Sequence, residues 1–267
     1  MPIKLARSRA PIFSKSSLDL ADLCARDLWR GKVYSSNALQ VSEEELLMMF
    51  SSPFINNAIG LKNEFKGAIT TAHVDQFIKV AGLSSNKRFS SDTLNLKKGI
   101  STIDTLVASR IKAAFLNVFN VDFHTLSTDL TEHLANDFFK ADVRRKKGSF
   151  VPLASRLLFF TVPNIPILNY SSQIADNLGL TKSPLDNLVE YNAVLVEGLN
   201  NNWDLLKEYQ MPFLTQAPFN DELWLIARNN GWWQRRVFDI AIMNYFNIQK
   251  PRQDLLDLCK TCPAIHP

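Results

Sequence analysis

Apolar residues along this chain recur at helical rather than strand spacing. In the run covering residues 101–120, apolar side chains follow one another at intervals of three and four positions. A second run places Leu130, Leu134 and Phe138 on one helical face. The pattern therefore predicts two amphipathic helices in the middle of the chain.

The same spacing predicts four more helices elsewhere. Ser42 followed by Glu45 has capping-box spacing and leads into an apolar stretch. One helix is predicted from Pro184, because proline suits the first helical turn. Two others are predicted at residues 221–230 and 232–247, where a following glycine and a later proline supply stop signals.

Strand signals are few. Residues 157–162 form an apolar run without a preceding turn signal, so we interpret them as a buried helix that ends before Pro163. The stretch 84–99, rich in serine, asparagine and lysine, is predicted to be a loop. The expected fold is mostly α, with an N-terminal helical region at 1–99 and a main helical lobe at 100–267, arranged as two lobes around a cleft.

Composition indicates a folded chain with a sizeable core. With 46% hydrophobic and 21% charged residues, the sequence is too apolar for a disordered protein. It contains no apolar run of about 18 residues, so neither a transmembrane helix nor a membrane partner is expected. The N-terminus is basic and polar without a long apolar stretch, which predicts a cytoplasmic location.

The chain has three cysteines, Cys24, Cys259 and Cys262, and the last two form a C-x-x-C pair followed by His266. Structural zinc sites take four ligands, and Cys24 could supply another only if the two ends of the chain met. A thioredoxin-like role needs a βαβ context, whereas this pair lies in a C-terminal tail. We therefore expect free thiols at the end of a helix, with no metal and no cofactor.

Basic residues gather in one cluster, although the net charge of +4 is small. A turn that presents backbone N–H groups at a helix N-terminus binds anions, and neighbouring cations add contacts to DNA phosphates. Arg156 follows within reach of the same phosphate. The predicted DNA-binding residues of the cluster are Arg144, Arg145, Lys146, Lys147, Gly148 and Ser149. The alternative, an exposed loop with Arg156 as an ordinary surface residue, stays open.

Residues 146–180 give the most specific signal. A basic turn containing glycine precedes a buried helix, then a loop with proline, an extended Ile-Pro-Ile-Leu and a polar residue that opens another helix. This order resembles the core of helix-hairpin-helix DNA glycosylases, and most of all the bacterial proteins similar to 8-oxoguanine DNA glycosylase. The resemblance implies a glycosylase-like fold with a hairpin-like element in the main lobe, followed by C-terminal helices.

Individual residues carry this resemblance. In that superfamily, a glycine-containing hairpin leads into a buried helix, and a loop of the type F-P-x-x-D delivers the catalytic aspartate. Gly148 stands near the hairpin turn, and Ala154 matches the small residue of the following helix. The stretch from Pro166 to Asn169 matches the loop, and residues 235–239 resemble an Arg-x-x-Asp pattern in the late helix.

The sequence departs from the superfamily pattern at three points. Asn169 stands where the aspartate is expected, Pro152 stands where bifunctional members place the attacking lysine, and the hairpin lacks its second glycine. A lysine would form a Schiff base, which proline cannot do. An amide can position water but lacks the full negative charge that stabilises an oxocarbenium-like sugar. The resemblance therefore implies a monofunctional enzyme that uses another carboxylate or a base that departs readily.

Three carboxylates are candidates for that charge. Asp176 follows Asn169 by seven residues, which places it two turns further along the same predicted helix, on the same face and about 10 Å away. Asp142 precedes the basic cluster, and Asp239 belongs to the late helix. The expected catalytic residues are Asn169, Asp176 and Asp142.

Trp232 and Trp233 are adjacent, so their side chains point about 100° apart on a helix. Either one is a candidate for an aromatic wall of a base pocket that stacks on a flipped base. Packing in the hydrophobic core is the alternative explanation for both.

The leading hypothesis is a DNA glycosylase-like enzyme that flips a modified or damaged base out of double-stranded DNA and excises it, in repair or in defence against phage. The alternatives are a catalytically inactive DNA-binding module of the same fold and a helical interaction protein without a nucleic-acid partner. Both hypotheses that involve DNA require that Gly148 and Asn169 border one nucleotide-sized groove.

Overall fold

The computed structural model describes residues 11–30, 42–50, 123–141, 147–163, 165–180, 182–214 and 221–261. All regular secondary structure in these ranges is helical, which confirms the predicted mostly α class for this part of the chain. The predicted helix at 101–120, the predicted loop at 84–99 and the predicted boundary near residue 99 lie outside the described residues. The arrangement of two lobes around a cleft stays a prediction.

The helices are, in chain order, α1 (Lys15–Trp29), α2 (Glu43–Phe50), α6 (Phe123–Ala141), α7 (Val151–Thr161), α8 (Ser172–Asn177), α9 (Pro184–Asn201), α10 (Trp203–Leu206), α11 (Asp221–Asn229), α12 (Trp232–Tyr245) and α13 (Gln253–Thr261). A short 3₁₀ helix, η2 (Lys147–Phe150), leads directly into α7. The sequence pattern predicts α2, α6, α7, α8, α9, α11 and α12, and the structure confirms each of them.

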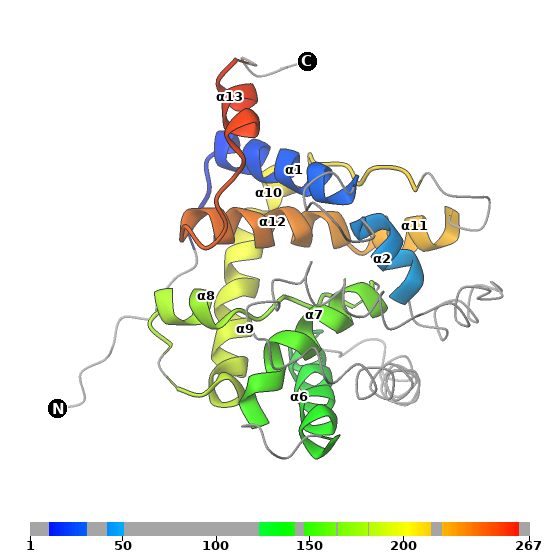
Figure 1. The fold of residues 1–267 in the computed structure, drawn as a ribbon, viewed down its shortest axis with the longest axis vertical. Helices are drawn as coiled ribbons and strands as arrows, with labels where there is room; N and C mark the ends of the chain where they lie inside the picture. The colour runs from blue at the N-terminus through cyan, green and yellow to red at the C-terminus, as the bar shows by residue number, and fades with distance from the viewer. Residues whose placement is uncertain are drawn as a thin grey trace, which may run out of the picture.

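α12 lies at the centre of the described helices (Figure 1). α1 runs alongside it with α13 beyond, while α7 and α6 lie on the other side. From Trp232 to Met243, every residue of α12 is buried except Gln234, which is half-buried. A helix covered on all sides is expected at the centre of a helical protein, but this one also buries two arginines, whose partners define the site described below.

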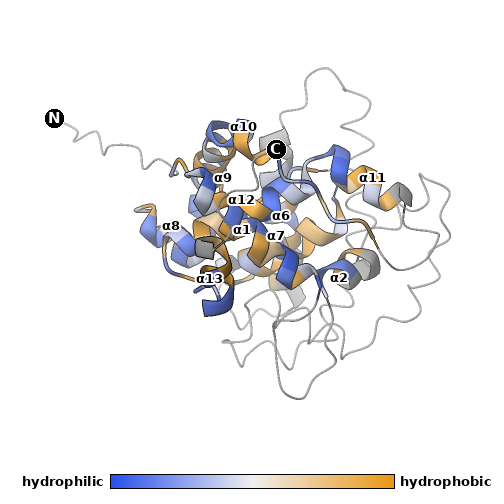
Figure 2. Ribbon diagram, turned by 90° about the horizontal axis from the view of Figure 1, so that it is seen from above, coloured by the Kyte–Doolittle hydropathy of each residue, from blue (hydrophilic) through white to orange (hydrophobic). Residues whose placement is uncertain are grey.

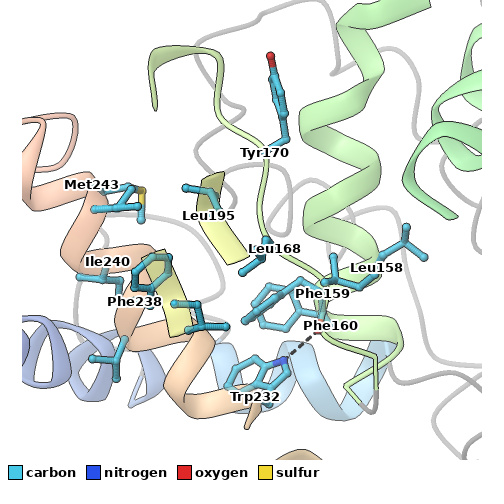
Figure 3. Packing of buried hydrophobic residues seen from close by; sticks show 14 of the residues in the cluster. Leu158, Phe159, Phe160, Leu168, Tyr170, Leu195, Trp232, Phe238, Ile240 and Met243 are labelled. Carbon is cyan, nitrogen blue, oxygen red and sulfur yellow. Dashed lines mark hydrogen bonds between the residues drawn. The ribbon is translucent and has the colours of Figure 1, made fainter. Parts of the chain in front are cut away.

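Aromatic side chains from three helices meet at the first turn of α12. Trp29 of α1 contacts both Trp232 and Trp233, with ring centroids 5.7 Å apart in each pair. Phe159 of α7 lies 4.9 Å from Trp232 by the same measure (Figure 3). The core continues through Leu46 of α2, so described residues of the predicted N-terminal region and of the main lobe share one hydrophobic core.

Hydrophilic residues cover much of α8 and α13, whereas α7 is largely hydrophobic (Figure 2). In α8 only Ile174 and Ala175 are buried, while most residues of α7 are. The apolar run that the sequence assigns to a buried helix is therefore enclosed by its neighbours, and α8 lies at the edge of the fold.

Gly231, at the junction of α11 and α12, occupies a position that requires glycine. Its φ of 66° is in the left-handed region, which side chains disfavour. A Cβ atom there would lie 3.0 Å from Cη2 of Trp203. The missing side chain therefore lets α10 pack closely against the start of the central helix.

Candidate functional site

The segment that joins α7 to α8 carries Asn169 and is held in place by Arg235 of α12. The buried guanidinium donates hydrogen bonds to the backbone carbonyls of Pro163 (3.0 Å), Ile165 (2.6 Å) and Ile167 (3.1 Å). Burial lowers the pKa of Arg235 to about 9, so the group is still charged at neutral pH and needs these acceptors. Arg235 thereby fixes the path of the extended segment toward Asn169.

Asn169 itself is only 3% exposed. Its Nδ2 donates to Oδ2 of Asp239 at 3.0 Å. The Tyr191 hydroxyl of α9 donates to the backbone carbonyl of Asn169 at 2.8 Å and accepts from the backbone N–H of Ser171 at 3.1 Å. Within the described part of the chain, Oδ1 of Asn169 has no hydrogen-bond partner. The amide is thus oriented by Asp239 and retains one buried acceptor.

Asp239 lies at the centre of a buried charged network. Besides Asn169, its Oδ2 accepts hydrogen bonds from Arg156 (3.0 Å) and Arg236 (2.6 Å). Arg236 also pairs with Glu43 of α2, and its Nε donates to Oε2 of that carboxylate at 2.9 Å. Two guanidinium groups face two carboxylates, so the network is neutral overall and avoids an unpaired buried charge.

The surroundings shift the pKa values of Arg236 and Tyr191. Burial alone would lower the pKa of Arg236, but the charges of Glu43 and Asp239 outweigh it and raise that pKa above its ordinary value. Burial, and after it the charge of Asp239, raises the pKa of Tyr191 well above its ordinary value. Arg236 is therefore charged and Tyr191 neutral throughout the neutral pH range.

Chemically, the site offers a carboxylate beside an amide. Asp239 supplies the negative charge that Asn169 lacks, and Oδ1 of Asn169 can accept a hydrogen bond from water or from a ligand. Oδ2 of Asp239 already accepts hydrogen bonds from Arg156, Arg236 and Asn169. Because these donors occupy that oxygen, the contribution that the carboxylate can make to a reaction is electrostatic.

The prediction that Asp176 lies on the same helix face as Asn169 is wrong. α8 begins after Ser171, whose side chain accepts from the backbone N–H of Ile174, so Asn169 belongs to the extended segment before the helix. Asp176 is exposed, whereas Asn169 is buried. The carboxylate next to Asn169 is Asp239, and Asp142 lies outside the described residues.

The basic cluster is described only from its fourth residue. Arg144, Arg145 and Lys146 lie outside the described residues, and the side chains of Lys147 and Ser149 are likewise not described. Gly148 is buried, and a Cβ atom there would lie 3.2 Å from Cδ of Pro184. The first turn of α9 therefore covers Gly148, which does not form the open turn expected for a phosphate contact.

Gly148 and Asn169 both contact α9, but at different points along it. Gly148 lies against Pro184 at the start of the helix, while the backbone carbonyl of Asn169 binds Tyr191 and its side chain binds Asp239 of α12. A single groove that both residues border stays a prediction, and it depends on the neighbouring residues 142–146 that the structure does not describe.

The alternative prediction that Arg156 is an ordinary surface residue is wrong. Its side chain is only 13% exposed, and it forms an ion pair with Asp239. The next turn of α7 contacts Trp232 of α12 through Phe159 and Phe160. A phosphate contact by Arg156 therefore has to compete with this carboxylate.

The prediction that Trp232 or Trp233 lines a base pocket is wrong. Both indoles are 0% exposed. Nε1 of Trp232 donates to the backbone carbonyl of Phe159 at 2.9 Å, shown by the dashed line in Figure 3. Nε1 of Trp233 donates to Asp22 of α1 at 2.8 Å. α12 has neighbours on both sides, so adjacent residues pointing in different directions are both buried.

Two residues of the site, Glu43 and Tyr191, have no role in the sequence analysis, and Arg235 enters it only as part of the range 235–239. Two successive arginines in a largely apolar helix are the available signal, because buried guanidinium groups require acceptors. That signal indicates that partners exist, but their identity depends on contacts between segments far apart in the sequence.

Comparisons of this chain with protein-family models, with curated proteins and with solved structures found no match. Among the helices of the described residues, none is both long and apolar enough to span a membrane.

Proposed function

We propose that this chain is a DNA glycosylase-like protein that flips a modified base out of duplex DNA and excises it without cleaving the strand. The 3.0 Å hydrogen bond between Asn169 and Asp239 carries this proposal. It provides a carboxylate beside the position at which the resembling superfamily uses its aspartate. The order of buried helix, extended segment and helix from α7 to α8 supports the same interpretation.

DNA binding would change the balance of charge around Asp239. Arg156 is the most exposed member of the network, at 13% of its side chain, and a DNA phosphate competes well for a guanidinium. When Arg156 turns to a phosphate, Asp239 keeps only Arg236 as a cationic partner. Its negative charge then becomes available to the sugar as the base departs.

A second candidate is a DNA-binding protein of the same fold without catalysis. The specific observation in its favour is that Arg156 and Arg236 together neutralise Asp239, while position 169 holds an uncharged amide. In this case the network is a structural support for the segment before α8.

The test measures abasic sites after incubation with duplexes that each carry one modified base. We expect the wild-type chain to form abasic sites on one of them, and Asp239→Asn to abolish this activity. The matched control is the exchange variant Asn169→Asp with Asp239→Asn, which retains one amide and one carboxylate in contact. If the exchange variant forms abasic sites and the wild type does not, the chain has lost catalysis, which supports the second candidate.

DNA binding is measured separately as affinity against salt concentration. We expect that neutralising Arg144, Arg145, Lys146 and Lys147 lowers the slope of log affinity against log salt by about 3 to 4, because each phosphate contact contributes about 0.9. Lys207→Gln, an exposed residue paired with Asp204, serves as the control. A wild-type chain that does not bind DNA even at low salt would exclude both candidates and leave a helical interaction protein.

A further inference from the structure

The segment 208–214, which follows α10, passes the C-terminal end of α1 and lies against α11 (Figure 1). Side chains from three helices donate hydrogen bonds to its backbone carbonyls. The donors are Gln234 of α12 (2.8 Å), Arg26 of α1 (2.9 Å) and Trp224 of α11 (3.1 Å). The path of this segment is therefore fixed, although it belongs to no helix.

Phe213 is held in an exposed position on this segment. Its side chain is 58% exposed, whereas Met211 and Leu214 on either side of it are buried. The Phe213 ring contacts Trp224, with ring centroids 4.8 Å apart and the two planes inclined at 50°. A ring that is already fixed binds a flat partner at a lower cost in conformational entropy than a mobile one.

Arginine side chains extend from this aromatic pair along α1. Cζ of Arg228, one turn after Trp224 on α11, lies 4.9 Å from the centroid of the Trp224 ring. Its Nη2 donates to the side chain of Gln210 at 3.4 Å, and Arg26 donates to the backbone carbonyl of the same residue. Arg30 is exposed and follows Arg26 by one helical turn. The three guanidinium groups therefore follow one another along this side of the molecule.

The row of arginines carries a net positive charge. Among the described carboxylates, Asp22 pairs with Arg26 at 2.6 Å, whereas the described partners of Arg228 are an amide and a ring, both uncharged. Asp27 is next to Arg26 in the sequence but pairs with Arg252, just before α13. Bases stack on aromatic rings, and phosphates accept strong hydrogen bonds from arginine. An exposed ring beside unpaired guanidinium groups therefore matches the chemistry of a single nucleic-acid strand.

We propose that a surface formed by α1, α11 and the segment 208–214 binds single-stranded DNA. An unpaired base stacks on the exposed part of Phe213, and the neighbouring phosphates contact Arg228 and Arg30. The choice of DNA over RNA rests on the proposed function, because an enzyme that extracts a base from a duplex leaves unpaired nucleotides. The members of this arginine–aromatic surface are Phe213, Trp224, Arg228, Arg26 and Arg30.

The test measures the affinity of the full-length chain for a fluorescently labelled oligothymidylate, by fluorescence anisotropy. We expect the wild type to bind, and Phe213→Ala to weaken binding by about 5- to 100-fold, because it removes one stacking contact. Phe213→Tyr keeps the ring and should retain most of the affinity, whereas Phe213→Leu, which is apolar but not aromatic, should bind as weakly as Phe213→Ala. The matched control is Tyr245→Ala, which removes an equally exposed aromatic side chain at the other end of α12 and should keep the wild-type affinity.

Salt dependence tests the phosphate contacts on the same oligonucleotide. Arg228→Gln should lower the slope of log affinity against log salt by about 0.7, the contribution of one phosphate of a single strand. Lys182→Gln, an exposed residue between α8 and α9, should leave the slope unchanged.

Four outcomes overturn the proposal. They are a wild type that does not bind oligothymidylate even at low salt, equal affinities of the wild type and Phe213→Ala, tighter binding of oligouridylate than of oligothymidylate, and self-association of the wild type that Phe213→Ala abolishes. The last outcome would assign the surface to a contact between two copies of the chain.

The proposed function and this proposal fail separately. A wild type that forms abasic sites in duplex DNA but does not bind oligothymidylate keeps the proposed function and overturns the arginine–aromatic surface as a DNA site. A wild type that binds oligothymidylate through Phe213 but forms no abasic sites supports the surface and contradicts base excision.

Discussion

Arg235 and Arg236 are neighbours in the sequence but have different kinds of partner. Arg236 faces the carboxylates of Glu43 and Asp239, whereas Arg235 donates to backbone carbonyls of the segment after α7. The planar guanidinium, with five donors in fixed directions, suits both tasks. One arginine positions the chain before Asn169 and the other positions the carboxylate beside it.

The first prediction concerns Arg235. Lysine carries the same charge but has a single ammonium group that cannot reach three carbonyls spread along the segment. We expect Arg235→Lys to lower the free energy of unfolding by about 2 to 4 kcal/mol, measured by urea denaturation. Arg228→Lys, at an exposed position on α11, should change it by less than about 0.5 kcal/mol. Equal effects of the two substitutions would contradict the positioning role of Arg235.

The second prediction concerns Tyr191, whose hydroxyl bonds to Asn169 and Ser171. Tyr191→Phe removes both hydrogen bonds and should lower the free energy of unfolding by about 1 to 2 kcal/mol at neutral pH. Burial raises the pKa of this tyrosine in the folded state, while the unfolded side chain ionises near pH 10. The stabilisation that the neutral Tyr191 hydroxyl provides is therefore complete below about pH 10. As pH rises further, the free energy of unfolding falls by up to about 1.4 kcal/mol per pH unit.

This pH dependence is measured as the difference in unfolding free energy between the wild type and Tyr191→Phe, at neutral pH and about one unit above pH 10. The difference should shrink at the higher pH. Tyr245→Phe, at a position that is 58% exposed, should show no such change. A difference that grows with pH would mean that Tyr191 is not buried as a neutral phenol.

Sequence alone could not predict the residues around Asn169 because they are brought together from distant segments. Asp239 is 70 positions away from Asn169, and Glu43 is 193 positions away from Arg236. The resemblance to glycosylases directs attention to Asn169, but the choice among its carboxylate neighbours depends on packing. Asp176 is close in sequence and exposed, whereas Asp239 is distant in sequence and in contact.

Local pattern predicts the helices well where the apolar period is regular. The run at 157–162 is correctly assigned to a helix because no turn signal precedes it and Pro163 ends it. The start of α8 is harder, since Asn169 and Ser171 are both suitable N-cap residues. Ser171 has this role in the structure, and the shift of two residues moves Asn169 into the extended segment.

The third prediction concerns the junction between α11 and α12. Gly231→Ala places a methyl group 3.0 Å from the Trp203 ring in a backbone conformation with positive φ. Gly179→Ala, after α8, meets the same conformational penalty at φ 75° but has open space around it. We expect Gly179→Ala to lower the free energy of unfolding by about 1 to 2 kcal/mol, and Gly231→Ala to lower it by about 1 to 3 kcal/mol more. Similar Tm values for the two variants would contradict close packing of α10 at this junction.

At the scale of the whole molecule, one buried ion pair connects α2 to the central helix. Glu43 and Arg236 are 2% and 4% exposed as side chains, and α2 also packs against α7. The fourth prediction is that Glu43→Gln lowers the free energy of unfolding by about 2 to 4 kcal/mol, because a buried guanidinium loses a charged partner. Glu132→Gln, at an exposed position of α6, is the matched control.

Hydrogen exchange locates the effect of Glu43→Gln. We expect faster exchange in α2 than in the wild type, with α9 protected as before, because the pair attaches α2 and not α9. Uniformly faster exchange along the described helices would instead show that the pair supports the fold as a whole.

The hydrogen bond between Trp233 and Asp22 joins positions 211 residues apart. During synthesis, α1 therefore leaves the ribosome long before the helix that covers its apolar face exists. At about 5 to 20 residues per second, this interval lasts roughly 10 to 40 seconds, in which Trp29 and its neighbours have no native partner from α12. A nascent chain of this protein is consequently expected to depend on chaperones that shield hydrophobic N-terminal segments until translation ends.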